Sequence, residues 1–290
     1  MIELLRQEGL QFLSDIPDGA VDLILTDPPY ITSRDSGMDK WVDHVTKQDA
    51  LDATDIMTEE DWQNYKTAEQ WDSWFEKSKV EPEHRESRLA KMKADFLKYG
   101  SIYGKKYAVK TNYGDWDSDF TVEQLELFIK HFYRVLKPSG TCIVFFDLWK
   151  ITNLKEMLEV EKFKQIRLVE WIKTNPQPIN SSVNYLTNCR EIALLGIKKS
   201  KPTFNSKYDK GIYHHPLQGG KNRFHPTQKS LPLFEELINK HSNPGDLVLD
   251  CFAGSATTAI AAMNTDRQFT GCELDEEYFN KSIERIEGNR

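Results

Sequence analysis

The sequence predicts an α/β protein built around a parallel, doubly wound sheet. Short apolar runs typical of buried strands, such as Val21–Thr26, alternate along the chain with segments of helical spacing, such as residues 122–136. This alternation is the pattern of folds in which helices connect parallel strands. The length of 290 residues is sufficient for one large domain or two small ones. A content of 39% hydrophobic and 29% charged residues is ordinary for a globular protein.

The expected elements follow one another in short units bounded by turn residues. Apolar runs predict strands at residues 2–5, 21–26, 141–146, 166–171, 191–197, 247–250 and 269–273. Helical spacing predicts helices at residues 10–16, 122–136, 231–241, 257–262 and 276–287. The second of these helices is expected to stop at Lys137-Pro138-Ser139-Gly140, because proline cannot continue a helix.

Residues 31–113 do not follow this alternation. They are charged, lack strand-like runs and include Trp41, Trp62, Trp71 and Trp74. Residues 57–79 and 82–99 have the character of helices, so we predict that 31–113 is a helical insertion and that 1–30 and 114–290 form one domain. A long insertion beside a chemical site is often a lid or a recognition element. The alternative is a helical hairpin that buries its own tryptophans.

The cysteines and the apolar content favour a cytoplasmic protein. Cys142, Cys189, Cys251 and Cys272 are scattered, with no CxxC pair, which indicates reduced cysteines and neither a disulfide framework nor a zinc site. No apolar stretch approaches the length of a membrane span, and residues 1–6 do not resemble a signal peptide. We therefore expect no membrane association and no metal.

Positive charge is concentrated in one part of an acidic chain. The net charge is −7, yet residues 162–229 carry 13 lysines and arginines against three acidic residues. A basic segment in an otherwise acidic chain is typical of a surface that contacts phosphates. For the short run at residues 197–201 alone, a solvated basic loop remains an alternative.

The first chemical motif is Asp27-Pro28-Pro29-Tyr30, which directly follows the strand expected at Val21–Thr26. Proline supplies a carbonyl acceptor and no N–H donor, so the motif offers an acceptor-rich edge with one carboxylate and one aromatic face. An exocyclic amine on a planar ring fits such an edge. The alternative is a Pro-Pro turn with an incidental Asp and Tyr.

A second motif lies near the carboxyl end of the chain. The strand expected at 247–250 ends in Asp250 and is followed by a turn of small residues and a helix. Small residues let backbone amides approach a ligand closely, as in nucleotide-binding α/β turns. Glu273, after the next strand, stands at about the interval at which such folds place an acid on ribose hydroxyls. The turn can also serve only to pack a helix on the sheet.

A third motif, His225-Pro226-Thr227-Gln228-Lys229-Ser230, opens the helix expected at 231–241. The free amides at a helix start favour a carboxylate ligand, and Lys229 adds a positive charge. Taken alone, the motif can be a helix cap and no more.

These motifs together resemble the β-class DNA amino-methyltransferases of bacteria and phages. These enzymes use S-adenosylmethionine to modify adenine N6 or cytosine N4. In this family the Asp-Pro-Pro-Tyr motif comes first, then a target-recognition segment, then a His-Pro-Thr-Gln-Lys element, and last the cofactor-binding turn. All four occur here in that order between residues 2 and 286. The resemblance implies a Rossmann-like methyltransferase fold with a mixed seven-stranded sheet, helices on both faces, a circularly permuted motif order and a target-recognition segment at 176–224.

The resemblance also assigns roles to residues. It implies that the catalytic residues are Asp27, Pro28, Pro29 and Tyr30. It implies that S-adenosylmethionine is bound by Glu8, Asp27, Thr227, Gln228, Lys229, Asp250, Phe252, Ala253, Gly254, Ser255, Thr257 and Glu273. Three positions depart from the family pattern: Glu8 stands in place of the usual Asp, Cys251 in place of proline, and Ala256 in place of the second glycine.

The implied reaction is methylation of adenine N6 in double-stranded DNA. Asp27 and the Pro28 carbonyl accept the two N–H bonds of a flipped-out base, Tyr30 stacks on it, and the methyl group is transferred in line, without a covalent intermediate. Phosphate and base contacts are expected from Lys173, Asn175, Arg190, Lys207, Arg223 and the run Asn180-Ser181-Ser182. The resemblance also implies that the chain can form a homodimer and can act beside a cognate restriction endonuclease.

Three other functions stay open at this point. Cytosine N4 methylation uses the same kind of site. Asp at the first motif position is more usual for adenine, and Ser for cytosine. RNA or protein-glutamine methyltransferases usually carry Asn before the two prolines. A non-catalytic DNA-binding paralogue would keep the fold, and Cys251 and Ala256 leave room for it.

Overall fold

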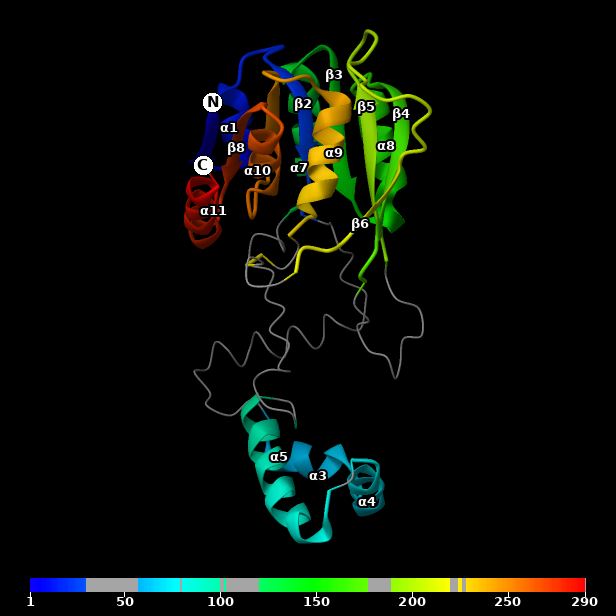
Figure 1. Cartoon of the computed structure of the whole chain (residues 1–290), viewed down its shortest axis with the longest axis vertical. Helices are drawn as coiled ribbons and strands as arrows, with labels where there is room; N and C mark the ends of the chain where they lie inside the picture. Colours follow the sequence, from blue (N-terminus) through cyan, green and yellow to red (C-terminus); the bar gives the residue numbers. More distant parts are fainter. Residues whose placement is uncertain are drawn as a thin grey trace. The chain divides into compact units, whose positions relative to one another are not determined.

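A computed structural model describes residues 1–29, 57–78, 80–99, 102, 120–176, 189–219, 224–225 and 228–289 (Figure 1). The chain forms two compact units. The larger comprises Met1–Ile31 and Tyr113–Arg290, and the smaller comprises Thr32–Asn112. No helix among the described residues is long and apolar enough to cross a membrane.

The larger unit is built on an eight-stranded sheet in its described part. Its strands are β1 (Ile2–Arg6), β2 (Val21–Thr26), β3 (Leu136–Phe146), β4 (Lys164–Lys173), β5 (Arg190–Ile197), β6 (Ile212–His215), β7 (Leu247–Asp250) and β8 (Gln268–Glu273). Their order is β1-β8-β7-β2-β3-β5-β4-β6. Neighbouring strands pair in parallel, except that β5 runs antiparallel to both β3 and β4. The mixed sheet and the fold class are confirmed, and the described sheet has one strand more than the seven expected.

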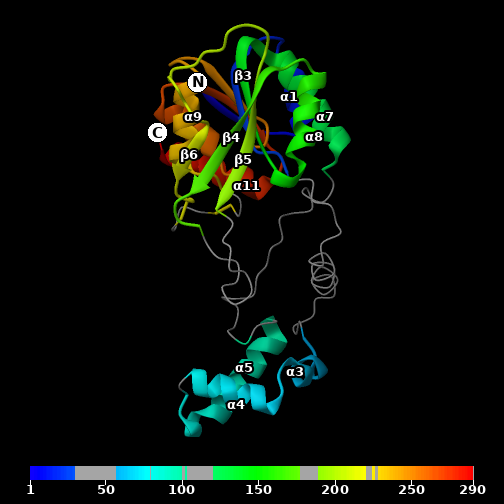
Figure 2. The same cartoon turned by 90° about the vertical axis from the view of Figure 1, so that its right-hand side faces the viewer.

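Helices cover both faces of this sheet, as Figure 2 shows. One face carries α1 (Gly9–Asp15), α7 (Val122–Val135) and α8 (Ile151–Val160), and the other carries α9 (Leu231–His241), α10 (Thr257–Asn264) and α11 (Glu276–Gly288). Each layer has its own core, because the strands are apolar on both faces. Phe12, Phe128 and Leu154 are buried on the first face, and Phe234, Ile260 and Ile286 on the second.

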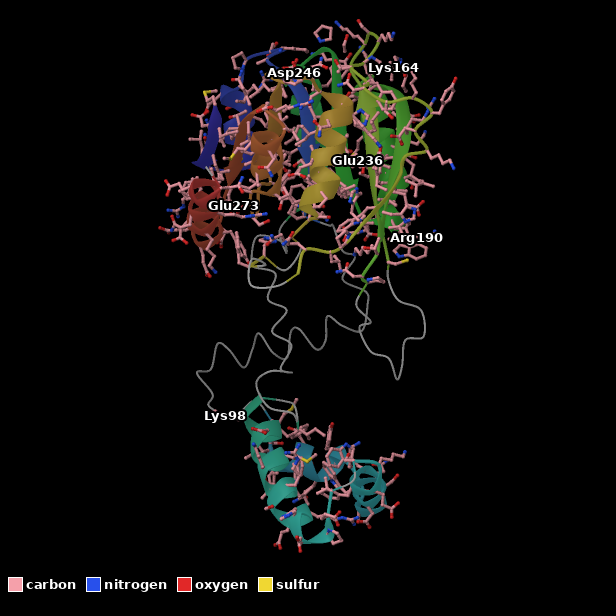
Figure 3. The ribbon with its side chains drawn as sticks, viewed as in Figure 1. Lys98, Lys164, Arg190, Glu236, Asp246 and Glu273 are labelled. Atoms are coloured by element: carbon pink, nitrogen blue, oxygen red, sulfur yellow. The ribbon has the colours of Figure 1, made fainter. Side chains whose placement is uncertain are left out.

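The chain reverses its winding between β2 and β7, which pair through Leu23 and Val248. From β2 the chain reaches β3 by way of α7, on one face; from β7 it reaches β8 by way of α10, on the other. Ligands of open α/β sheets bind beside the carboxyl ends of the strands at such a switch point. In Figure 3 the labelled Glu273 and Arg190 mark this end of the sheet, and Asp246 and Lys164 mark the opposite end.

The structure corrects three details of the expected elements. The turn Lys137-Pro138-Ser139-Gly140 ends the helix as predicted, but it belongs to β3, which begins at Leu136 because this residue pairs with Val21. Helix α8 was not expected. Strand β6 was not expected either, because it has only four residues, in which exposed Ile212 and buried Tyr213 alternate.

The described part of the smaller unit is helical and has a core of its own. It contains α3 (Glu59–Tyr65), α4 (Ala68–Lys77), the 3-10 turn η1 (Pro82–His84) and α5 (Arg85–Tyr99). Capping boxes at Thr58 and Thr67 start two helices where one run was expected at 57–79. Trp62, Trp71 and Trp74 pack in this core, as the hairpin alternative requires, and Trp41 lies outside the described residues.

Candidate active site

Asp27 stands at the carboxyl end of β2, beside the switch point. Pro28 is buried and Pro29 half-buried, so the strand ends in a rigid turn whose prolines lack N–H donors. Tyr30 lies outside the described residues. The predicted catalytic motif therefore begins at the edge of the sheet where α/β proteins bind their ligands.

The two oxygens of Asp27 have different surroundings. Oδ2 lies 2.8 Å from Nζ of Lys229, whereas Oδ1 is buried and accepts no hydrogen bond from the part of the chain that the structure describes. Burial raises the pKa of Asp27 to about 6; Lys229 opposes this rise, and Glu191 and Asp250 add to it. The carboxylate is still ionised at neutral pH. Oδ1 is therefore an acceptor in need of a donor.

Lys229 connects Asp27 to a second acid that the motifs did not reveal. Nζ of Lys229 lies 2.6 Å from Oε2 of Glu191, and the other oxygen of Glu191 lies 2.7 Å from Nζ of Lys173. Although burial opposes it, these two ammonium groups bring the pKa of Glu191 below its ordinary value. The signal in the sequence was an acid at the start of the apolar run 191–197. The expected contact of Lys229 with the cofactor's carboxylate stays a prediction.

Asp250 holds the second motif in place. Its Oδ1 accepts hydrogen bonds from Oγ1 of Thr26 (2.6 Å) and from the amide of Phe252 (3.0 Å), and its Oδ2 accepts one from Oγ1 of Thr258 (2.6 Å). Burial nevertheless raises the pKa of Asp250. The side chain thus joins β7 to β2 and to the start of α10. A direct contact of Asp250 with a cofactor stays a prediction.

Two residues of the turn after β7 have a positive φ. Gly254 has a φ of 51°, and a Cβ added there would lie 3.5 Å from Nε2 of His225. Ala256 has a φ of 57°, in the left-handed region that favours glycine, so its departure from the family pattern falls on a strained position. Ala253, Ser255 and Ala256 are buried, and the amide of Ala253 donates to the carbonyl of Cys272.

Glu273, at the carboxyl end of β8, accepts from two backbone amides. The amide of Gly254 donates to Oε2 over 2.7 Å, and the amide of Asp275 donates to Oε1 over 2.9 Å. Burial raises the pKa of Glu273 to about 7, although these amides oppose the rise. The acid predicted to bind a ribose is therefore bonded directly to the turn predicted to bind the rest of the cofactor.

One face of α11 supports the same turn, which the sequence reasoning missed. Oγ of Ser282 donates to the carbonyl of Gly254 over 2.7 Å, and Nη1 of Arg285 donates to the carbonyl of Ser255 over 2.6 Å. The ring of Tyr278 lies 4.3 Å from that of His225. The spacing 278, 282, 285 places these residues on one face of a helix, but it does not show which turn that face contacts.

We expect Arg285→Met to weaken cofactor binding about tenfold, because it removes a charged donor to a carbonyl of the turn. Isothermal titration calorimetry with S-adenosylmethionine measures this. A matched control on the same helix is Glu276→Gln, which breaks an exposed ion pair with Arg6 and is expected to leave the affinity unchanged. Equal affinities of the two variants would contradict the prediction.

The other predicted cofactor residues lie around the turn. Glu8 is exposed and caps α1, where its Oε2 accepts from the amide of Gln11 over 2.9 Å. Phe252 is half-buried and packs on Phe128, with ring centroids 4.6 Å apart. Thr257 and Gln228 are buried, and Thr227 lies outside the described residues.

The predicted DNA-contacting residues are only partly described. Arg190 is 64% exposed and lies 3.4 Å from Glu170, and Lys207 is exposed. Asn175 accepts from the amide of Leu217 over 2.6 Å, which fixes the chain after β4. Lys173 lies within the ion pairs of Glu191. Arg223 and the run 180–182 fall outside the described residues.

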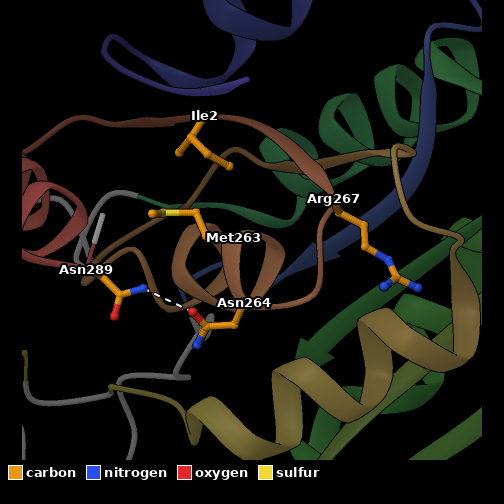
Figure 4. Close-up of a pocket in the computed structure, with 5 residues that line it drawn as sticks. All are labelled: Ile2, Met263, Asn264, Arg267 and Asn289. Atoms are coloured by element: carbon orange, nitrogen blue, oxygen red, sulfur yellow. Dashed lines mark hydrogen bonds between the residues drawn. The ribbon is translucent and has the colours of Figure 1, made fainter.

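A pocket elsewhere in the larger unit is separate from this site. Figure 4 shows the residues that line it: Ile2, Met263, Asn264, Arg267 and Asn289. Ile2 begins β1 and Arg267 directly precedes β8, so the pocket lies at the amino ends of these strands, opposite the candidate site. The four cysteines are free thiols, and no group of three or more metal-ligating side chains occurs within the described ranges.

Known proteins share both the sequence pattern and the fold. A family model described as DNA methylase, for N6 and N4 methyltransferases, matches residues 97–284. The Type II methyltransferase M2.DpnII of Streptococcus pneumoniae is 32% identical over 72% of this chain and 85% of its own length. M2.MboI of Moraxella bovis is 31% identical over 64% of this chain and 74% of its own.

Two solved structures have the same fold at lower sequence identity. The complex of M1.HpyAVI with SAM superposes with a TM-score of 0.59 at 23% identity, covering 99% of both chains. PvuII DNA methyltransferase, described as cytosine-N4-specific, superposes with a TM-score of 0.60 at 15% identity, covering 99% of this chain and 90% of its own. These likenesses concern the fold.

Proposed function

The chain belongs to the DNA methylase family, and from this premise we propose that it methylates the N6 amine of adenine in double-stranded DNA. It is a DNA methyltransferase that uses S-adenosylmethionine. The observation that carries the proposal is Oδ1 of Asp27, a buried acceptor that receives no hydrogen bond from the described residues, at the switch point of the sheet.

This oxygen suits an aromatic amine. The lone pair of such a nitrogen is delocalised into the ring, so the nitrogen is a poor nucleophile until it becomes more tetrahedral. A carboxylate that accepts one N–H bond favours that change, and a carbonyl such as that of Pro28 supplies the second acceptor. With a pKa of about 6, Asp27 is ionised at neutral pH and accepts the bond without first losing a proton.

The residues around the second motif fit the cofactor. The turn consists of small residues, and Glu273 is joined to it through the amide of Gly254, with its other oxygen on the amide of Asp275. When bound, S-adenosylmethionine supplies a methyl group on a sulfonium. The bond between Thr26 and Asp250 joins the strand that ends at Asp27 to the strand that ends at this turn. The two sites are therefore held at one edge.

The target amine of duplex DNA is inaccessible until the base is flipped out, at a cost of a few kcal/mol. Contacts from the basic segment offset this cost and set the position of the duplex. The exposed side chains of Arg190 and Lys207 support this role. Contacts from Lys173, Asn175 and Arg223 stay predictions, as do stacking by Tyr30 and the cofactor contacts of Thr227.

Cytosine N4 is the second candidate target. The fold shared with a cytosine-N4-specific enzyme supports it, and Asp27 in place of Ser favours adenine. A non-catalytic paralogue has less support, because it has no need for a buried acceptor without a donor. Homodimer formation, a cognate restriction endonuclease, a place in the bacterial cytoplasm and a role for 31–113 stay predictions.

A methyl-transfer assay tests the proposal. The full chain is incubated with methyl-labelled S-adenosylmethionine and mixed genomic DNA, and the nucleosides are separated by mass. We expect label in N6-methyladenine and none above background with Asp27→Ala. Label in N4-methylcytosine would replace the proposal by its second candidate, and no transfer to any DNA would contradict both.

A further inference from the structure

Asp27 is the end of a chain of four charged side chains. Asp27, Lys229, Glu191 and Lys173 alternate in sign, and their contacts measure 2.8, 2.6 and 2.7 Å. We call these four residues the site ion chain. They come from different parts of the fold: the end of β2, the segment before α9, the start of β5 and the end of β4. Their formal charges sum to zero.

The site ion chain is shielded from water. Only 8% of the Lys229 side chain and 11% of the Lys173 side chain are exposed, against 18% and 20% for the two acids. A shielded charge is tolerated when an opposite charge is close, and removal of one partner leaves the other uncompensated. The loss of one member therefore affects the position and pKa of its neighbour more strongly than in an exposed ion pair such as that of Lys155 with Glu159.

We propose that Glu191 is a positioning residue for methyl transfer, which holds Lys229 on one oxygen of Asp27 and so leaves the other oxygen for the amine. This rests on the proposed function. A lysine ammonium is a compact charge on a flexible stem, and beside a single carboxylate it can turn to cover both oxygens. A second carboxylate on its other side restrains it. Here Glu191 takes that position with its Oε2, and its Oε1 forms an ion pair with Lys173.

The strand register brings Glu191 to this edge. Thr26 pairs with Val144 on β3, and Phe146 pairs with Ile192 on β5, so Glu191 follows at the level of the residues after β2. Lys173 precedes the predicted recognition segment 176–224, and Glu191 lies within it. The amide of Lys173 donates to the carbonyl of Cys189 over 2.7 Å. In the site ion chain, two ion pairs separate Lys173 from Lys229, and three separate it from Asp27.

Opposite changes in the pKa of Asp27 distinguish this role from simple structural support. In the part of the chain that the structure describes, the charged groups that face Asp27 are Lys229, Glu191 and Asp250. Glu191→Gln removes a negative charge, so the pKa of Asp27 falls. Lys173→Met leaves Glu191 with Lys229 as its remaining partner in the site ion chain, so Lys229 is drawn away from Asp27 and the pKa of Asp27 rises. A loss of structure alone does not produce two shifts of opposite sign.

The experiment measures kcat between pH 5 and 9 at saturating cofactor and DNA. We expect the acid limb to move down by about half a pH unit or more in Glu191→Gln and up by a similar amount in Lys173→Met. We expect kcat of Glu191→Gln at pH 7.5 to fall about tenfold, because Lys229 then covers both oxygens of Asp27. Glu191→Asp restores part of the loss.

A matched control lies in α9. Glu236 also sits between two basic side chains, 2.6 Å from both His215 and Lys240, away from the site. Glu236→Gln is expected to lower the melting temperature without moving the acid limb. Acid limbs that stay within 0.2 pH units in both Glu191→Gln and Lys173→Met, with kcat within twofold, would overturn the proposal.

Carboxyl ¹³C NMR measures the pKa of Asp27 directly and does not require an activity assay. Asp27 is assigned by its absence in Asp27→Asn, and its titration is followed in the wild-type protein, in Glu191→Gln and in Lys173→Met. Opposite shifts support the proposal, and an unchanged titration of Asp27 refutes it. If Glu191→Gln does not fold, Glu191→Asp and Lys173→Met carry the test. Absence of methyl transfer by the wild-type protein counts only against the proposed function.

Discussion

Asp27→Ala is expected to abolish methyl transfer, with kcat lower by at least about a thousandfold, while cofactor binding stays largely intact. The reason is that Oδ1 of Asp27 is the acceptor proposed for the reacting nitrogen, whereas the residues predicted to bind the cofactor, the turn and Glu273, follow β7 and β8. Tritiated-methyl transfer measures the first quantity and titration calorimetry the second. Turnover near that of the wild type would remove Asp27 from catalysis.

A control for this variant lies on the same strand. Asp22 stands at the other end of β2, where it pairs with Lys137 at 2.8 Å and accepts from the amide of Leu247. Asp22→Asn is expected to lower stability and to keep turnover. The wild-type protein also has a predicted pH dependence at saturating cofactor: kcat/KM for DNA holds above the Asp27 pKa of about 6 and falls as the pH drops through it, because protonation removes the acceptor.

Glu273→Ala is expected to weaken cofactor binding between about tenfold and a hundredfold. The variant removes the acceptor predicted for the ribose hydroxyls and the bonds that the amides of Gly254 and Asp275 donate to Glu273, so the turn is less firmly fixed. We expect kcat at saturating cofactor to change little. Titration calorimetry measures the affinity, and Glu273→Gln, which keeps one acceptor oxygen, should fall between the alanine variant and the wild type.

The raised pKa of Glu273 gives this prediction a pH dependence. With a pKa of about 7, the free protein carries Glu273 partly protonated at neutral pH. Ribose hydroxyls donate to the ionised form, so cofactor affinity should increase from pH 6 to pH 8, and binding at pH 7 should release protons. Calorimetry in buffers of different ionisation enthalpy detects this release. An affinity that is unchanged in Glu273→Ala would remove Glu273 from the cofactor site.

Several elements could be predicted closely because local signals agree there. The strands Val21–Thr26 and Leu247–Asp250 and the helix Leu231–His241 have the predicted bounds. In each of these, an apolar pattern ends at a proline, a small-residue turn or a polar cap. Strand β6 could not be predicted, because it is held by pairing with β4 and its own pattern covers only four residues.

In the candidate site, too, some residues could be predicted from the sequence and others could not. Asp27, Gly254 and Glu273 stand in motifs whose residue types and order are visible in the sequence. Glu191 and Arg285 were missed, because their roles depend on partners 38 and 30 residues away, Lys229 and Ser255. Such pairings are set by strand register and helix placement, which local spacing does not encode. Lys173 belongs to the basic segment, and its pairing with Glu191, 18 residues along the chain, depends on strand register in the same way.

The pairing of β2 with β7 has a consequence for synthesis of the protein. Thr26 and Asp250, bonded across these strands, are 224 residues apart. At about 5–20 residues per second, a ribosome needs on the order of ten seconds or more to make the intervening chain. During that time Asp27 has been made and Lys229 has not. We therefore expect that a nascent chain cannot modify DNA before β7 and β8 are made, because the turn and the acid predicted to bind the cofactor follow these strands.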